Sequence, residues 1–566
     1  MNKNIIGKIA ILSLGAAVLL QFIMPFVYPI VGHDAAVHLN WLEQFPKLFR
    51  EGNLYPRWMP DSFWGFGSPA FYFYPPLTYW VSGCISLIFP YVSAVTLFVI
   101  VGWIFTCCSA GTCYFYLRGI MVDRWPATIG ALLYAILPYR FVDLYVRNAL
   151  SEHASFIFFP IIFLAIEIAI SNYPLTKREK LLSTVLSIIG WAGLLMTNIP
   201  MSVIGIYSVP IYGILRSFKH RRHWQLAFPL GGSFIALAIA AVYWVPISPL
   251  ISEIKLSHLW DISYAEGETG YALLDVTSHG HLHLFFVSVN LCILISCLIL
   301  YISVRFSKQF MSYRDMLSAW NVILFISLIF QIPYVLKPLW DVLPLMNLMQ
   351  FTWRWQSLGT LAAVACITMI VSSGHSKRRI NWSITTISLL SLLLSLGGYV
   401  YFFSGLFSQP LPSKKLESID APEYVSRFAS NNYDTVISSY RAHRNDPDVI
   451  VVNGLLTHSQ FFPTEEERGE LHFQVGGSTG RCNVVFHTIY FPTWHLFDDG
   501  GNEYPIGADS IGRIVATLPQ GDRNYVLKLV KTNQERIGYW ISIAGLGIFG
   551  LLGVITILSR RQATSF

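Results

Sequence analysis

The sequence predicts a polytopic α-helical membrane protein with a long first extracytoplasmic loop and a small β-rich domain before its last helix. Three observations lead to this fold class. The chain of 566 residues is 54% hydrophobic and only 13% charged, its mean hydropathy is +0.51, and its basic residues form short clusters between long apolar runs. Soluble domains carry roughly 25% charged residues. The composition therefore excludes an ordinary soluble protein and a disordered one.

Apolar runs long enough to cross a bilayer recur along the chain, since a hydrocarbon core about 30 Å thick needs roughly 20 apolar residues of helix. The first run is too long for a signal-peptide core and lacks a small-residue cleavage site, so we expect it to remain as an anchor. The twelve candidate spans are 5–30, 92–117, 125–139, 153–171, 181–197, 199–216, 225–250, 283–304, 317–333, 356–373, 383–407 and 537–558.

The distribution of basic residues predicts the orientation. With both termini in the cytoplasm, the inside loops carry nineteen Lys and Arg residues and the short outside loops carry eight. Residues 76–90 would invert every later loop if they crossed the membrane, so we expect them to form a helix on the outer face or dipping into it. Carboxylates are more frequent in the outside loops, and chemistry that uses them is therefore expected on the extracytoplasmic side.

Composition divides the chain into three parts. Residues 1–407 are predicted to form the membrane module, 408–536 an extracytoplasmic β-rich domain, and 537–566 the last helix with a cytoplasmic tail. The middle part has ordinary soluble composition, and its runs of alternating polar and apolar residues are separated by glycine-rich turns, which is typical of an antiparallel β domain. Alternating runs occur at 448–452, 471–475 and 525–530.

Several classes of site are not supported by the sequence. The net charge of +7 does not indicate nucleic acid, because that partner requires a basic face on a folded domain. Of the eight cysteines, all but Cys482 lie in or beside apolar runs and none forms a CxxC pair, so neither a disulfide framework nor a zinc–thiolate site is predicted. The chain has no GxGxxG, Walker A or HExxH motif, and no cytoplasmic nucleotide site is expected.

The first outside loop, residues 31–75, holds the acid best suited to catalysis. Asp34 follows the first predicted span at the membrane–water boundary, where a carboxylate can accept a proton from a hydroxyl. His33 and His38 flank it, and the glycine- and aromatic-rich remainder, which includes Tyr74, suits a loop that packs at the membrane surface and lines a groove. The composition equally allows an interfacial aromatic belt in which Asp34 merely ends a helix.

A second group of charges lies between the third and fourth predicted spans. This short outside loop contains Arg140, Asp143, Arg147 and Glu152, and arginine is suited to fork-like contact with phosphate oxygens. Asp143 and Arg147 are also spaced i,i+4, as in a plain helix ion pair. That alternative leaves Glu152, at the entrance of a span, unexplained.

Three further features are weaker. Arg354 lies between two tryptophans at a span entrance and suits either an interfacial anchor or a contact to a lipid-linked phosphate. His281 and His283 would face one side of an extended segment and could bind a metal, although such histidines are more often ordinary loop residues. Glu167 lies in the fourth span near its cytoplasmic end, where snorkelling to water is expected.

Several loop motifs resemble known membrane families. The segments GHDAAVHLNWLEQF, YRFVDLYVRNALSEHASFIFFP and FTWRWQSLG resemble a polytopic bacterial family labelled as related to 6-pyruvoyl-tetrahydropterin synthase. The segment YFPTWHLFDDGGNEYPIGADSIGRIVATLPQGDRNYVLKL resembles the end of YfhO-like membrane proteins. Both are similar to the GT-C class of glycosyltransferases. The resemblance implies a GT-C-like helical bundle in the bacterial cytoplasmic membrane, with an extracytoplasmic active site.

The resemblance also implies roles for individual residues. Asp34 takes the catalytic position of the first loop, and Glu152 takes the second acidic position. Histidine rather than a second acid precedes Asp34, which puts in doubt the paired-acid metal site of some members. A divalent ion therefore stays open, with His281 and His283 as weak candidates. The candidate substrate-binding residues are His33, His38, Arg57, Tyr74, Arg147 and Arg354, and the three arginines are candidates for the donor phosphate on charge and location only.

The function expected from these features is an inverting hexosyl- or pentosyltransferase. It would move a sugar from a polyprenyl phosphate or diphosphate, entering from the outer leaflet, to an extracytoplasmic glycan, lipid or protein, with Asp34 as general base. Two alternatives stay open: a transporter or flippase of lipid-linked sugar, and a non-catalytic scaffold of the cell envelope. A transporter would place charged residues near mid-membrane in repeated halves, whereas these spans are nearly free of charge.

Overall fold

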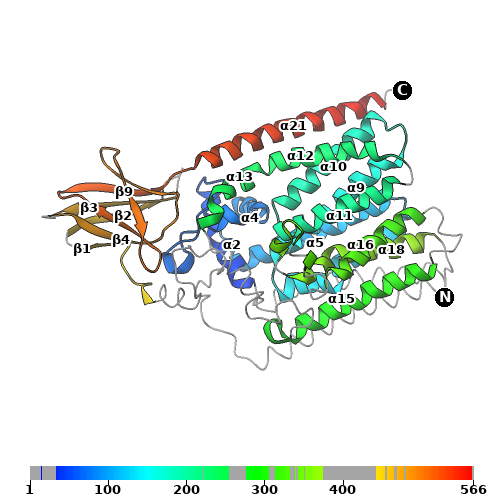
Figure 1. The fold of residues 1–566 in the computed structure, drawn as a ribbon, viewed down its shortest axis with the longest axis horizontal. Helices are drawn as coiled ribbons and strands as arrows, with labels where there is room; N and C mark the ends of the chain where they lie inside the picture. Colours follow the sequence, from blue (N-terminus) through cyan, green and yellow to red (C-terminus); the bar gives the residue numbers. More distant parts are fainter. Residues whose placement is uncertain are drawn as a thin grey trace.

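A helical bundle and a β domain at one of its ends make up the protein (Figure 1). Apart from Gly15, the predicted span 5–30 lies outside the described residues, as do the predicted span 383–407 and His33. The computed structural model describes Gly15 and residues 34–218, 221–253, 276–304, 313–331, 338–339, 342–349, 351–373, 442–452, 455–463, 468–476 and 480–563.

The helices of the bundle run roughly side by side along the long axis of the molecule (Figure 1). In the described part of the chain, five stretches are long and apolar enough to cross a membrane, or up to seven if two bent helix pairs each count as one span. The predicted number of about twelve spans is therefore not confirmed. The five stretches are α5 (Ala94–Gly119), Leu150–Ser171, which contains α8 (Leu150–Ser155) and α9 (Phe158–Ser171), α11 (Ile199–Phe218), Thr352–Ser372, which contains η7 (Thr352–Trp355) and α18 (Gln356–Ser372), and the first 24 residues of α21 (Asn533–Ala563).

Two predicted spans are broken by sharp bends. Residues 225–250 form η3 (His223–Leu226) with α12 (Ala227–Ile239), and then α13 (Ala241–Leu250) at an angle of 61°. Residues 125–139 form α6 (Arg124–Ile136), which meets α7 (Pro138–Phe141) and the π-helical turn η2 (Val142–Val146) at 40°. A proline cannot continue the hydrogen bonding of the preceding turn, and Pro138 starts α7 at the second bend.

The remaining helices complete the bundle. Helices α10 (Lys177–Leu195), α15 (Val276–Val304) and α16 (Arg314–Ile329) fall near the predicted spans at 181–197, 283–304 and 317–333. Helix α4 (Leu77–Ile88), within the predicted surface helix 76–90, has 12 residues and is too short to cross. Loops predicted to be cytoplasmic meet at the end of the bundle away from the β domain. There Asp123 donates its N–H to Ser372, and Tyr313 its hydroxyl to Met121.

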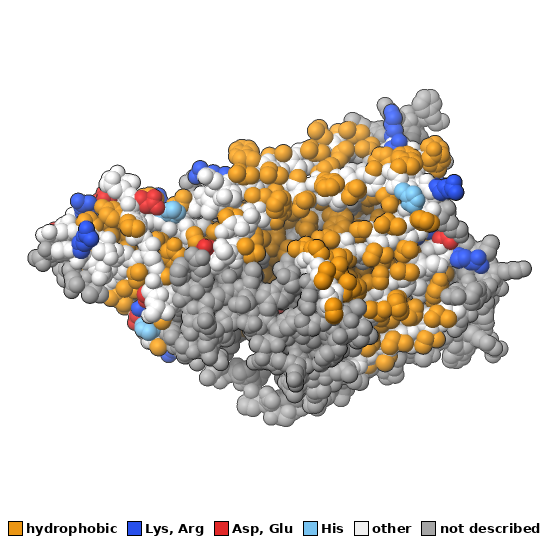
Figure 2. All heavy atoms as spheres, in the orientation of Figure 1, with side chains coloured by type: hydrophobic (Ala, Val, Ile, Leu, Met, Phe, Trp, Pro, Cys, Tyr) orange, Lys and Arg blue, Asp and Glu red, His pale blue; other side chains and the backbone are white. Residues whose placement is uncertain are grey.

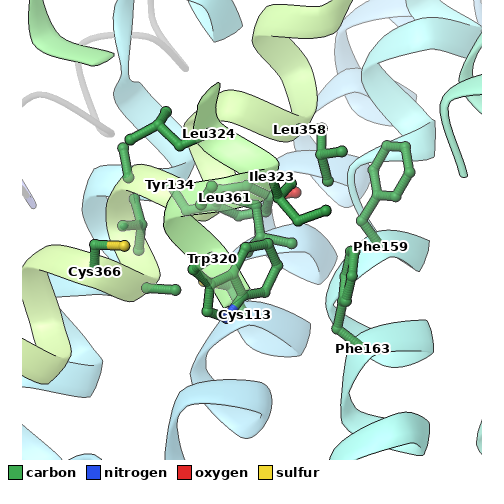
Figure 3. Close-up of a cluster of buried hydrophobic side chains, with 14 of the residues drawn as sticks. Cys113, Tyr134, Phe159, Phe163, Trp320, Ile323, Leu324, Leu358, Leu361 and Cys366 are labelled. Atoms are coloured by element: carbon green, nitrogen blue, oxygen red, sulfur yellow. The ribbon is translucent and has the colours of Figure 1, made fainter. Parts of the chain in front are cut away.

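The bundle is held together by a large hydrophobic core. Figure 3 shows part of it, where Trp320 on α16 lies among Phe159 and Phe163 on α9 and Leu361 on α18. Outside this core the described surface of the helices is largely apolar (Figure 2). Helix α21 in particular exposes large hydrophobic side chains along its length, as expected of a helix that faces lipid.

One acid within the bundle behaves differently from the sequence expectation. Glu167 does not snorkel to water: its oxygens accept from Nε and Nη2 of Arg216 at 2.6 and 2.8 Å, and from the hydroxyl of Tyr212 at 2.6 Å. Its side chain is buried. A buried carboxylate requires such a charged, hydrogen-bonded partner, and here that partner lies 49 residues away on α11.

The C-terminal part forms two antiparallel sheets, which confirms a small β domain before the last helix. Strand order is β1-β4-β8-β7 in one sheet and β2-β3-β9-β5-β6 in the other. The alternating runs predicted as strands correspond to β1, β3 and β9. The strands are β1 (Val449–Val452), β2 (Leu455–Pro463), β3 (Arg468–Gly476), β4 (Cys482–Ile489), β5 (Trp494–Asp498), β6 (Glu503–Tyr504), β7 (Ile506–Ala508), β8 (Arg513–Leu518) and β9 (Arg523–Leu529).

The first loop and the β domain share one hydrophobic core. The ring of Trp58 lies 5.3 Å from that of Trp494, and Phe66 stacks on His487 at 3.9 Å between ring centroids. Gly67 allows this packing because its φ is +81° and a Cβ there would come within 2.5 Å of the Trp58 ring. Aromatic residues of the loop therefore join it to the β domain, a role outside both sequence interpretations.

Candidate functional site

Asp34 lies at the start of α2 (Ala35–Arg50), at the end of the bundle that carries the β domain. Its N–H donates to the carbonyl of Arg147 at 2.8 Å, and its own carbonyl accepts from the N–H of His38. These backbone bonds fix the residue in place, whereas its carboxylate makes no cap bond to the helix. The side chain is 41% exposed, so its carboxylate is accessible from outside the protein.

The guanidinium of Arg147 faces the carboxylate of Asp34. Its Nη2 is 3.6 Å from Oδ2 of Asp34, which is an ion pair beyond hydrogen-bond distance. The chain reaches this position through η2, after which Asn148 takes a positive φ of 59° and donates its side-chain N–H to the carbonyl of Leu144. Asparagine tolerates this left-handed conformation better than most residues. The turn thus brings the backbone of Arg147 to Asp34 and its guanidinium into the protein.

Glu152 is the centre of the charged cluster. Its side chain is 1% exposed, and it lies in the first turn of α8, where a negative charge suits the helix dipole. Oε2 accepts from Nη1 of Arg147 at 2.7 Å and from Nε of Arg354 at 3.0 Å. Oε1 accepts from the hydroxyl of Tyr139 at 2.6 Å. Both carboxylate oxygens are therefore occupied by protein donors.

Arg354 reaches the same carboxylate from a distant part of the sequence. It lies in η7, at the start of the helix that becomes α18. Its Nη1 donates to the carbonyl of Met349 at 2.8 Å, and its guanidinium carbon lies 5.1 Å from the centroid of the Phe351 ring. The guanidinium of Arg147 also lies over this ring, at 5.7 Å. Two cations therefore share one carboxylate and lie near one aromatic ring.

Asp143 adds a third carboxylate to the cluster. Its Oδ1 accepts from Nη1 of Arg147 at 3.3 Å, which is the i,i+4 pair that the spacing predicts. Its Oδ2 is buried without a hydrogen-bond partner. Because Asp143 and Glu152 both bind the guanidinium of Arg147, they fix its position relative to Asp34.

His38 and Tyr74 pack beside this cluster. His38 is buried one turn after Asp34, and its Nδ1 lies 2.5 Å from the hydroxyl of Tyr79. The ring of Tyr74 lies 6.1 Å from His38 and 4.7 Å from Trp41. Burial lowers the pKa of His38 to about 4, while Asp34 acts to raise it and Arg147 to lower it. His38 is therefore neutral near pH 7, and its buried ring packs against Tyr74 and Tyr79 one turn after Asp34.

This burial predicts a pH-dependent stability. The folded pKa of His38, about 4, lies below the unfolded value of 6.5. Its contribution is therefore fully present above pH 6.5 and is lost as the pH falls to 4. The loss amounts to about 3 kcal/mol at most. Thermal unfolding of the detergent-solubilised parent and of His38→Gln measures it, and stability curves that stay parallel between pH 6.5 and 4 would contradict the assignment.

Arg57 does not join the cluster around Glu152. Its Nε pairs with Glu535 on α21 at 2.9 Å, and its Nη2 donates to the carbonyl of Val242 at 2.7 Å. Its guanidinium carbon also lies 4.0 Å from the centroid of the Tyr55 ring. The structure thus places Arg57 where it ties the first loop to α13 and α21.

The candidate metal ligands His281 and His283 lie within α15, so the expectation of an extended segment there is wrong. At Asp34, the neighbouring carboxylates of Asp143 and Glu152 are bound by Arg147. No three His, Cys, Asp or Glu side chains of the described chain come together as a metal site requires. The donor set around Asp34 does not fit a divalent cation.

Sequence reasoning missed two members of the site. Tyr139 carries no charge and lies 13 residues before Glu152, so no helical or strand spacing links them. Tyr79 meets His38 across 41 residues of sequence. The signal available was weak: Tyr139 follows Pro138 directly and opens the charged loop.

Comparisons with known proteins give a fold likeness only. No protein-family model matches the chain, and no curated protein matches it either. Two structures of an oligosaccharyltransferase from Archaeoglobus fulgidus are similar. The enzyme in complex with an inhibitory peptide and a dolichol-phosphate has a TM-score of 0.37, and the apo form has 0.40, each at 12% identity. This chain spans 59% of that protein, and the match covers 76% of this chain. At these scores the likeness says nothing about activity.

Proposed function

We propose that the protein is a membrane glycosyltransferase that transfers a sugar from a polyprenyl phosphate or diphosphate to an acceptor on the extracytoplasmic side. The observation that carries the proposal is the exposure and surroundings of the Asp34 carboxylate. It is an accessible carboxylate without a helix cap bond, and it lies 3.6 Å from a buried arginine that other acids hold in place. The bacterial cytoplasmic membrane, with both termini in the cytoplasm, is the proposed location.

The chemistry requires a base and a stabiliser of negative charge. The acceptor oxygen attacks the anomeric carbon and gives its proton to a carboxylate oxygen of Asp34. At the same time the bond from the anomeric carbon to the phosphate oxygen breaks, and the phosphate leaves with the bonding electrons. Attack from the side opposite the leaving group inverts the anomeric configuration. Because Asp34 is partly exposed, it then releases the proton to water.

In this proposal the buried guanidiniums of Arg147 and Arg354 stabilise the negative charge of the departing phosphate. Arg147 and Arg354 bring two cations to one carboxylate, Glu152, and positioned cations stabilise charge that develops in a transition state. Glu152 itself is buried and fully hydrogen-bonded. In this proposal it acts on the reaction through the arginines, and Asp34 is the catalytic residue.

A transfer assay with the purified full chain tests the proposal. The protein is incubated in proteoliposomes with polyprenyl-phosphate sugars of several hexoses and pentoses and with hydroxyl acceptors. We expect a glycosylated acceptor whose anomeric configuration is inverted relative to the donor. Retention of configuration would contradict direct displacement. Movement of the donor between leaflets without transfer to any acceptor would contradict the enzyme and favour a flippase.

A further inference from the structure

A buried tyrosine hydroxyl and two arginines bind different oxygens of Glu152. Tyr139 lies in α7, the short helix that follows the bend after α6, and its side chain is fully buried. Its hydroxyl donates to Oε1 of Glu152 at 2.6 Å. Arg147 and Arg354 both donate to Oε2, at 2.7 and 3.0 Å. The two guanidiniums therefore converge on a single oxygen.

We infer that Tyr139 is a positioning residue for the reaction, because its hydroxyl occupies Oε1 of Glu152 and confines both arginines to Oε2. The inference rests on the proposed function. A carboxylate frequently binds an arginine through both of its oxygens. Here Oε1 accepts from Tyr139, Arg147 binds Oε2 alone, and its Nη2 lies 3.6 Å from Oδ2 of Asp34.

Loss of the hydroxyl has a defined physical consequence. A buried carboxylate oxygen without a donor is costly, so in Tyr139→Phe a guanidinium would turn to bind Oε1. Arg147 makes the shorter bond to this carboxylate and would move toward it, away from Asp34. The carboxylate of Asp34 then loses part of the neighbouring positive charge, and the departing phosphate loses a positioned cation.

Tyr134→Phe is the matched control. Tyr134 is also fully buried, and its hydroxyl also makes one hydrogen bond, to the carbonyl of Phe156 at 3.0 Å. This bond is not part of the Glu152 cluster. Both variants therefore remove one hydroxyl from a fully buried tyrosine, but only Tyr139→Phe removes a donor to Glu152.

The experiment compares both variants with the parent in the transfer assay, with rates divided by the folded fraction. We expect Tyr139→Phe to lose about tenfold in kcat/KM. The low-pH limb of its kcat/KM profile should move to higher pH by about half a unit or more, because Asp34 loses cationic stabilisation. Tyr134→Phe should match the parent in both measurements.

Two outcomes separate the inference from the function on which it rests. If Tyr139→Phe and Tyr134→Phe have the same kcat/KM and the same pH profile while Asp34→Asn is inactive, Tyr139 does not position the arginines and the base assignment still holds. If Asp34→Asn transfers sugar at the parent rate, the proposed function itself fails, whatever the tyrosine variants do.

Discussion

Replacing Asp34 by asparagine is expected to lower the rate of sugar transfer by about 10²–10⁴-fold, which is the usual contribution of a general base. Asparagine has nearly the same shape but cannot accept the proton of the acceptor hydroxyl. It also suits the start of a helix as well as aspartate does, and the backbone bonds from Asp34 to Arg147 and His38 remain available. The measurement is the initial rate of transfer by the purified, folded variant.

Asp61→Asn provides the control for this prediction. Asp61 lies in the same loop and is exposed, and its substitution removes the same negative charge from the same side of the protein. We expect the Asp61 variant to keep the parent rate. Equal rates for Asp34→Asn and Asp61→Asn would show that Asp34 is not the base.

The elements that the sequence predicts correctly depend on local patterns. All four residues of strand β1 fall within the alternating run 448–452. Strand β9 begins two residues after Gly521, a turn residue with a φ of 115°. Alternation and turn residues act over a few neighbours, so the chain alone reveals them. The bend between α12 and α13 is different, because 225–250 contains no charged residue and no polar residue marks the break at Ala240.

At the candidate site, too, local contacts could be predicted from the sequence and long-range contacts could not. The pair Asp143–Arg147 follows from its i,i+4 spacing and is present. By contrast, Arg354 meets Glu152 across 202 residues, and Arg57 meets Glu535 on the last helix. These contacts depend on how helices pack, and the two arginines look alike in sequence, since each lies near aromatic residues in a predicted outside loop. Only packing separates the arginine that faces the acid cluster from the one that ties α21 to the first loop.

The second large effect is expected at Glu152, and it concerns stability. Glu152→Gln removes the buried negative charge that Arg147 and Arg354 share. Breaking a buried ion pair by removing one partner costs about 3–5 kcal/mol, because the remaining charge is left uncompensated. Unfolding of the detergent-solubilised protein by heat or denaturant measures the loss. Glu43→Gln, an exposed position on α2, should leave stability unchanged.

A double-mutant cycle determines whether this loss comes from the stranded arginine. Arg354→Met in the parent breaks the same pair from the other side, whereas in the Glu152→Gln background it removes a cation that no longer has its partner. We therefore expect the second substitution to cost less in the variant than in the parent, by 1 kcal/mol or more for two groups in direct contact, on the order of measured coupling energies. If the losses in unfolding free energy are additive, Glu152 and Arg354 stabilise the protein independently. The carboxylate of Glu152 would then not be the group that positions the two arginines near Asp34.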